Sequence, residues 1–287
     1  MFNFREMLID RFVEELRQSY QQSYRMMEPQ FPNIIEWTGR LALENIANSD
    51  NLYHDVEHTI LVTLVGQAIL KGKHLSEGGV SPSDWLHFTM ALLCHDIGYV
   101  RGVCREDRLG VYATGIDGGM VEINDDYTDS VLTPYHVDRS KLFVSERFGT
   151  QTLVDVVDPE RIVTLVERTR FPIPDGAVYQ ITNDYPGLLR SADFIGQLGD
   201  PNYLQKIPAL YYEFEENGVN SQKGYQNPGH MRRAYTKFYW NVVVPRIGDA
   251  IRYLNVTQEG KQWVANLYAH VHKMEHYLEE NGTLPQA

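Results

Sequence analysis

The sequence predicts an all-α protein built as one bundle of helices over residues 1–287. In most segments the apolar residues recur three or four positions apart, which is the period of a helix that buries one face. No segment alternates apolar and polar residues convincingly enough for a strand, and no stretch rich in Gly, Ser or Pro divides the chain. We therefore expect a single helical domain, with its core at about residues 50–200 and the terminal helices packed against it.

The first two helices are predicted at residues 5–27 and 34–49. Large apolar or aromatic residues recur every four positions in the first of these: Leu8, Phe12, Leu16 and Tyr20. This spacing puts the four side chains on one face of the helix, and that face should point into the bundle.

The third and fourth helices are predicted from residue 54 to about 70 and at 81–98. Three residues that commonly cap helices precede the third: Ser49, Asp50 and Asn51. Ser81 or Ser83 can cap the fourth helix, and Gly98 should end it.

The helical period stops at Gly98 and returns only after Pro134. A long irregular segment inside a domain is usually a functional lid or an insertion, so residues 98–134 should border a site. Six further helices are predicted beyond it, at 139–148, 159–169, 185–198, 201–218, 229–254 and 257–281. Pro245 should kink the helix at 229–254, because proline cannot donate the backbone hydrogen bond.

Composition narrows the class of function. The formal net charge of −12 argues against a nucleic-acid polymer or an anionic membrane as partner. The two cysteines, Cys94 and Cys104, are too few for a disulfide framework and suit a reducing cytoplasm. The first residues lack the apolar core of a signal peptide, and the run "ILVTLVGQAIL" is too short to span a bilayer. We therefore expect a cytoplasmic protein, for which a homodimer is an open possibility.

Three short stretches carry residues suited to metal binding. "NLYHDVEHTILVTL" places His54 and His58 four residues apart at the start of an apolar run. "MALLCHDIGYVRG" places His95 and Asp96 side by side at the end of an apolar helix, and "LLRSADFIGQL" sets Asp193 in a largely apolar helix. Buried charges need partners, and imidazole and carboxylate both bind divalent metals. We expect His58, His95, Asp96 and Asp193 to converge on one metal ion at helix ends.

The order His, His-Asp, Asp resembles the signature of the HD-domain superfamily of metal-dependent phosphohydrolases. The stretch "YHDVEHT" is also similar to the Tyr-His-Asn-x-x-His-Ala motif of class I cyclic nucleotide phosphodiesterases, which belong to that superfamily. The resemblance covers about residues 52–198, and the flanking regions rest on periodicity alone.

The resemblance implies an HD-like helical bundle and a role for each residue. His58, His95, Asp96 and Asp193 would bind a divalent metal ion. Asp96 would also act in catalysis by bridging to a second metal, and His54 would protonate the leaving oxygen. One or two ions of Mg, Mn, Fe, Co, Ni or Zn would activate water for hydrolysis of a small phosphorylated substrate, such as a nucleotide or a cyclic nucleotide.

Departures from these motifs leave alternatives open. Asp55 and Thr59 replace Asn and Ala of the phosphodiesterase motif, and "HDIGYVRG" lacks the continuation of that family. It also lacks the Pro of the HD-GYP signature of cyclic dinucleotide enzymes. A regulatory module that binds a nucleotide without turnover is one alternative. The other is a di-iron oxygenase of the same superfamily, which needs two more histidines between His95 and Asp193, where only His136 is found.

Three further residues are candidates for contacts with substrate: His136, Arg139 and Arg101. His136 lies where helix resumes after the long segment, and it could instead bind a second metal. Other residues are better explained by structural or solvent-exposed roles than by a role in the site. We expect a packed core thiol at Cys94, and an exposed helix face at His272 and His276. The acidic residues of the long segment should form a solvated lid: Asp117, Glu122, Asp125, Asp126 and Asp129.

Overall fold

The computed structural model describes residues 3–149 and 156–281. Helices account for most of it, so the prediction of an all-α fold is confirmed. The first half contains α1 (Phe4–Tyr24), α2 (Phe31–Ile46), α3 (Val56–Glu77), α4 (Pro82–Cys94), the 3-10 turn η1 (Ile97–Tyr99), β1 (Val111–Ala113), β2 (Met120–Glu122), the 3-10 turn η2 (Asp129–Leu132) and α5 (His136–Phe148). The second half contains α6 (Pro159–Glu167), α7 (Ala177–Gln180), α8 (Tyr185–Leu198), α9 (Tyr203–Glu216), α10 (Val219–Lys223), α11 (Pro228–Phe238), the π-helical turn η3 (Tyr239–Val243), α12 (Val244–Leu254) and α13 (Gln258–Glu280).

The start of α3 differs from its prediction. Asp55 is the N-cap of the helix, and its side chain accepts a hydrogen bond of 3.0 Å from the backbone N–H of His58. An acidic cap satisfies one of the free N–H groups of the first turn, so the helix begins at Val56. The prediction that His54 opens this helix is therefore wrong, and His54 lies just outside it.

Helix α4 begins as predicted and ends early. Ser81 and Asp84 form a reciprocal capping box at its start. Its last residue is Cys94, and His95 and Asp96 lead directly into η1. The two site residues therefore stand at the helix end, where the chain can turn both side chains to one side.

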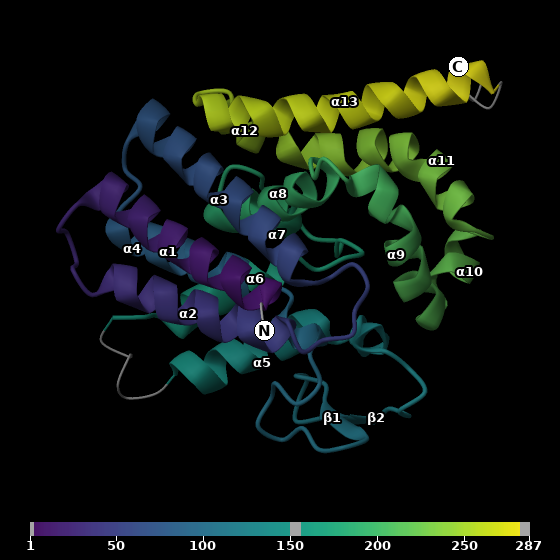
Figure 1. Ribbon diagram of the computed structural model, residues 1–287, viewed down its shortest axis with the longest axis horizontal. Helices are drawn as coiled ribbons and strands as arrows, with labels where there is room; N and C mark the ends of the chain where they lie inside the picture. The colour runs from purple at the N-terminus through teal and green to yellow at the C-terminus, as the bar shows by residue number, and fades with distance from the viewer. Residues whose placement is uncertain (1–2, 150–155, 282–287) are drawn as a thin grey trace.

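The segment between η1 and α5 contains a small hairpin, which the sequence did not predict. Strands β1 and β2 pair antiparallel, with Val111 opposite Glu122 and Ala113 opposite Met120. Three residues are too few to show the alternation that identifies a strand. Figure 1 shows the hairpin projecting from the lower edge of the helical body, below α5. It has its own small apolar cluster of Tyr112, Ile123 and Leu132.

One hydrophobic core joins the helices from α1 to α13. Helices α3 and α8 lie side by side near the centre of Figure 1, and α13 runs along the upper edge. Their approach is close because Gly196 of α8 has no side chain. A Cβ at this position would lie only 2.7 Å from Cα of Val62. This packing brings the first turn of α3 to the middle of α8, where Asp193 lies.

Near Pro245 the predicted helix at 229–254 is interrupted. Helix α11 ends at Phe238, the π-helical turn η3 follows, and Pro245 stands in the first turn of α12. Proline has no N–H to donate to the preceding turn, so the regular hydrogen-bond ladder shifts at this point.

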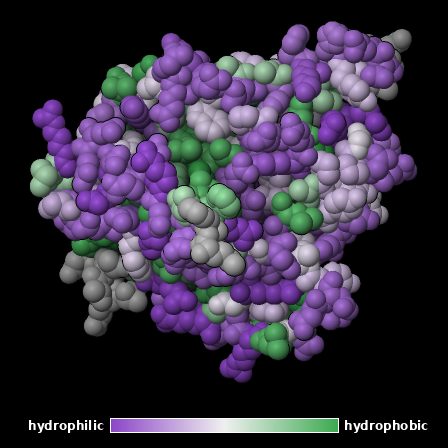
Figure 2. All heavy atoms as spheres, viewed as in Figure 1, coloured by the Kyte–Doolittle hydropathy of each residue, from purple (hydrophilic) through white to green (hydrophobic). Residues whose placement is uncertain are grey.

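The surface is mainly hydrophilic on the face that Figure 2 presents, with hydrophobic residues in scattered patches and in a recessed area near the centre. Among the described helices, none has the length and the apolar character needed to cross a membrane.

Candidate metal centre

The four residues predicted as metal ligands converge in the structure. The Nε2 atom of His58 lies 3.2 Å from Oδ2 of Asp96 and 3.6 Å from Oδ1 of Asp193. The Nε2 atom of His95 lies 3.1 Å and 3.8 Å from the same two oxygens. Two ligands that are each about 2.0–2.3 Å from one transition-metal ion lie at most roughly 4.6 Å apart. The four separations meet this condition.

Backbone carbonyls orient two of the imidazole rings. Nδ1 of His95 lies 2.7 Å from the carbonyl oxygen of Leu92, and Nδ1 of His136 lies 2.6 Å from that of Thr133. A carbonyl oxygen can only accept, so each Nδ1 carries a proton, and each Nε2 is the ring atom that faces Asp96. Hydrogen bonds of this kind commonly hold metal-binding histidines in the correct tautomer.

The donor set fits a divalent cation. His58 and His95 are buried, and neither Nε2 atom has a well-formed hydrogen bond within the part of the chain that the structure describes. Buried polar atoms without partners are uncommon in native proteins. Two groups of side chains could hold an ion: His58 with His95 and Asp193, and His54 with His58 and Asp96.

The electrostatics of two carboxylates, Asp96 and Asp193, also favour a positive charge close to them. Burial alone would raise the pKa of Asp96, but the histidines around it, His95 first, hold that pKa well below its usual range. Burial raises the pKa of Asp193 despite the opposing effect of His95, and the charge of Asp96 adds to the rise. The raised pKa means that the charged form of Asp193 is unfavourable in these surroundings. A bound divalent metal would stabilise that charged form.

His54 is paired with Glu213 of α9, a residue that the sequence analysis did not identify. Nδ1 of His54 lies 2.5 Å from Oε2 of Glu213. The other oxygen, Oε1, accepts the backbone N–H groups of Tyr53 at 2.6 Å and His54 at 3.2 Å. Burial would lower the pKa of His54, but the Glu213 carboxylate outweighs this effect and raises it to about 9. His54 can therefore carry a proton at neutral pH, with Nε2 free to donate it.

His136 approaches Asp96 from another direction. Its Nε2 atom lies 3.8 Å from Oδ1 of Asp96, whereas His58 and His95 lie nearest to Oδ2. Burial lowers the pKa of His136 to about 4, so its imidazole is neutral and able to bind a metal. The two oxygens of Asp96 therefore face different histidines.

The other two candidates for substrate contact need correction. Arg139 is fully buried and donates to both carboxylate oxygens of Asp107 and to the carbonyl oxygens of Gly98, Val100 and Ala113. Its prediction as a substrate contact is wrong, because these partners occupy the guanidinium group. Arg101 donates to the carbonyl oxygens of Tyr127 and Thr128, at 2.6 and 3.1 Å. Both arginines brace the hairpin segment.

The predicted segment 98–134 meets the His-Asp cluster at both of its ends. This cluster comprises His54, His58, His95, Asp96, His136 and Asp193. Tyr99 at its start stacks on His54 and His136, and Thr133 near its end accepts from His136. The acidic residues between them are mostly exposed, but Asp129 is buried beside Arg101 and is not part of a solvated face.

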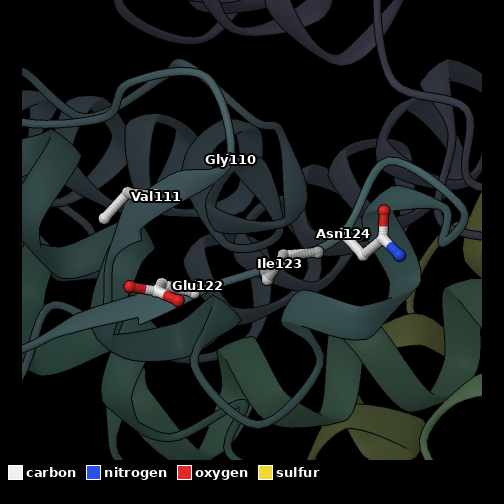
Figure 3. A pocket seen from close by; sticks show the side chains of 5 residues that line it. All are labelled: Gly110, Val111, Glu122, Ile123 and Asn124. Atoms are coloured by element: carbon white, nitrogen blue, oxygen red, sulfur yellow. The ribbon is translucent and has the colours of Figure 1, made fainter.

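Two open hollows lie beside the hairpin. The first, about 460 Å³, is lined by Gly110, Val111, Glu122, Ile123 and Asn124 (Figure 3). The second, about 280 Å³, reaches Tyr135 and Asn217. Neither hollow is lined by a residue of the His-Asp cluster. The candidate site is therefore defined by the contacts among the side chains of the cluster, and neither hollow is assigned to it.

Two predictions of residues outside the site are confirmed. Cys94 is a buried free thiol in the core. His272 and His276 are exposed on α13.

Fold and cluster together define an all-α protein whose buried histidine and aspartate side chains can hold a metal ion. The chain belongs to the Npun_R2479-like family, whose model matches residues 2–277. The description of this family names neither a reaction nor a ligand. No curated protein matches the chain.

Proposed function

We propose that the protein is a metal-dependent phosphohydrolase that cleaves a small phosphoester, such as a nucleotide. The observation that carries this proposal is the convergence of His58, His95, Asp96 and Asp193, in the sequence order that resembles the HD-domain superfamily. A bound divalent ion would supply an activated water molecule and polarise the phosphoryl group.

The side chains divide the work. His58, His95 and Asp193 would hold the first ion together with Asp96. His136 and Oδ1 of Asp96 are placed to hold a second ion, since they lie 3.8 Å apart on the other side of that carboxylate. A shared carboxylate would keep two ions close together, as in two-metal hydrolases.

His54 is the general acid. Glu213 holds its Nδ1 atom and stabilises the protonated ring, so Nε2 can give a proton to the leaving oxygen. One ring nitrogen of His54 lies within 4.8 Å of a ring nitrogen of His58 and a carboxylate oxygen of Asp96, and this proximity supports the role of an acid beside the metal site.

A comparison of His58→Ala with His54→Ala tests this proposal. His58→Ala should lose the metal, because four protein ligands become three. His54→Ala should keep its metal and fold, yet lose roughly 10²–10⁴-fold in rate on an alkyl phosphoester. The loss should be much smaller on a nitrophenyl ester, whose leaving group needs no proton. Metal content is measured by mass spectrometry, and both rates are measured on the same preparations.

Three outcomes would contradict the proposal. A wild-type protein that binds metal and nucleotides but hydrolyses no phosphoester would be a regulatory module instead. A His54→Ala protein with full activity on the alkyl ester would end the acid assignment. A His58→Ala protein with full metal content would end the ligand assignment.

A further inference from the structure

Tyr99 lies between two histidines of the candidate site. Its ring stacks on His54 at a centroid distance of 4.7 Å and an interplanar angle of 21°. On the other face it stacks on His136 at 4.4 Å and 12°. The side chain is buried, with 3% of its surface exposed. The three rings form one stack, which we call the His54–Tyr99–His136 stack.

The backbone holds Tyr99 firmly in this place. Gly98 next to it packs so tightly on α5 that a Cβ there would overlap the carbonyl oxygen of His136. The N–H of Gly98 donates to Oγ of Ser140 at 2.9 Å, and its carbonyl oxygen accepts from Arg139 at 2.6 Å. The position of Tyr99 relative to α5, and therefore to His136, is fixed by these contacts.

Hydrogen bonds fix each imidazole at only one atom. Glu213 holds Nδ1 of His54, and the carbonyl oxygen of Thr133 holds Nδ1 of His136. A ring held at one atom can still tilt about that bond, which would swing Nε2 away from Asp96. The Tyr99 ring removes this freedom for both histidines at once, because it covers one face of each.

We infer that Tyr99 is a positioning residue: its ring is the spacer that sets the orientation and separation of His54 and His136. This inference rests on the proposed function for what it says about rate. In that reaction Tyr99 makes no contact with substrate, and it acts by keeping the acid and the second-metal ligand aimed at the two sides of one site.

Two substitutions separate the ring from the hydroxyl. Tyr99→Phe keeps the aromatic stack and removes the hydroxyl, and Tyr99→Leu removes the stack. Tyr99→Phe should stay within a few fold of wild-type kcat. Tyr99→Leu should lose on the order of 10–100-fold in kcat on an alkyl phosphoester and much less on a nitrophenyl ester, a part of the full effect of a general acid. It should keep one equivalent of the first metal, because the rings stacked on Tyr99 in the described part of the chain are those of His54 and His136, which are not assigned to that metal.

A matched control tests whether loss of any buried tyrosine has this effect. Tyr20 of α1 is also buried and packs on Tyr24, with ring centroids 5.2 Å apart. Tyr20→Leu should lower the melting temperature without changing the ratio of the two rates.

A second readout does not need turnover. In zinc-loaded protein, long-range ¹H–¹⁵N spectra of the imidazoles should show one fixed state for each ring in wild type and Tyr99→Phe: His54 with protons on both nitrogens, and His136 with its proton on Nδ1. In Tyr99→Leu both rings should give averaged or broadened signals. If the wild type hydrolyses no phosphoester, this spectrum still decides whether Tyr99 positions the rings. Unchanged spectra together with an unchanged ratio of rates in Tyr99→Leu would overturn the inference. Equal losses in Tyr99→Phe and Tyr99→Leu would also overturn it, because the hydroxyl would then carry the effect.

Discussion

Glu213 is one of three acidic residues in the stretch 213–216, and only this one faces the candidate site. Its side chain is almost fully buried and binds His54 through both the ring and the backbone. Burial of an unpaired carboxylate costs free energy, so burial favours contact between Glu213 and His54. Burial also strengthens that contact, because the local dielectric constant is low. The pair gives His54 its positive charge and its direction.

Glu213→Gln should therefore weaken the acid without removing it. The amide keeps the shape and can still accept the backbone N–H groups, but it does not stabilise a protonated imidazole. We expect kcat on an alkyl phosphoester to fall by up to the roughly 10²–10⁴-fold that general acid catalysis contributes, with metal content unchanged. Steady-state rates on alkyl and nitrophenyl esters measure the effect.

Glu215 offers a matched control on the same helix. Its Oε2 atom accepts from Asn220 at 2.8 Å, and His54 is not among its partners. Glu215→Gln should leave both rates near wild type. Equal rates for Glu213→Gln and wild type on the alkyl ester would show that the carboxylate does not support the acid.

At the residue scale, the sequence predicted the candidate metal ligands more completely than the residues that hold them in place. His58, His95, Asp96 and Asp193 stood out because each is polar in an apolar context. Glu213 was missed because its partner is 159 positions away and the surrounding stretch is acidic. One signal was present: Ile207, Leu210 and Glu213 follow each other at three-residue intervals, so an acid stands on the apolar face of α9. The burial of Arg139 could not be predicted, because its partner Asp107 lies in a segment without a readable pattern.

At the scale of elements, the junction between η1 and α5 positions His136. Gly98 is a point of close approach, since a Cβ added there would overlap the carbonyl oxygen of His136 and lie 2.6 Å from the amide nitrogen of Ser140. Only glycine lets two backbones approach this closely. Gly98→Ala must push α5 away from the turn that carries His95 and Asp96.

We expect Gly98→Ala to lower the free energy of unfolding by about 1–3 kcal/mol, which is typical of overpacking. The matched control is Gly248 in α12, where an added Cβ meets no atom within 4 Å. Gly248→Ala should raise stability by up to about 1 kcal/mol, because alanine favours helix. Urea unfolding of both variants measures the difference. Equal stability of Gly98→Ala and wild type would contradict the close packing of this junction.

The long helices were predictable because their ends carry local signals. The bounds of α8 match the predicted 185–198, with Asp184 as the N-cap and Gly199 after the last residue. The start of α3 was placed two residues early, because His54 looks helical at four-residue spacing while Asp55 provides the actual cap. The hairpin was missed because its strands contain three residues each and its position depends on contacts with α5.

For the molecule as a whole, the cluster lies where α3, the end of α4 and α8 meet inside a chain of net charge −12. The carboxylates at this junction, Asp96 buried and Asp193 partly buried, repel each other unless a cation lies between them. A metal that binds the folded state only would stabilise the fold by RT ln(1 + [L]/Kd), or about 2.7 kcal/mol at a hundredfold excess over Kd. The site should therefore act on the stability of the whole chain as well as on the proposed reaction.

Removal of metal by a chelator should lower the melting temperature, and return of a divalent ion should restore it. Scanning calorimetry of the same sample before and after dialysis against EDTA measures the shift. His58→Ala should melt at the lower temperature with or without metal, because its site is incomplete. His276→Ala should keep the full response, because His276 is exposed on α13, where it forms an ion pair with Glu280. If neither chelator nor metal changed the melting temperature of the wild type, the cluster would be stable through its own histidine–carboxylate pairs.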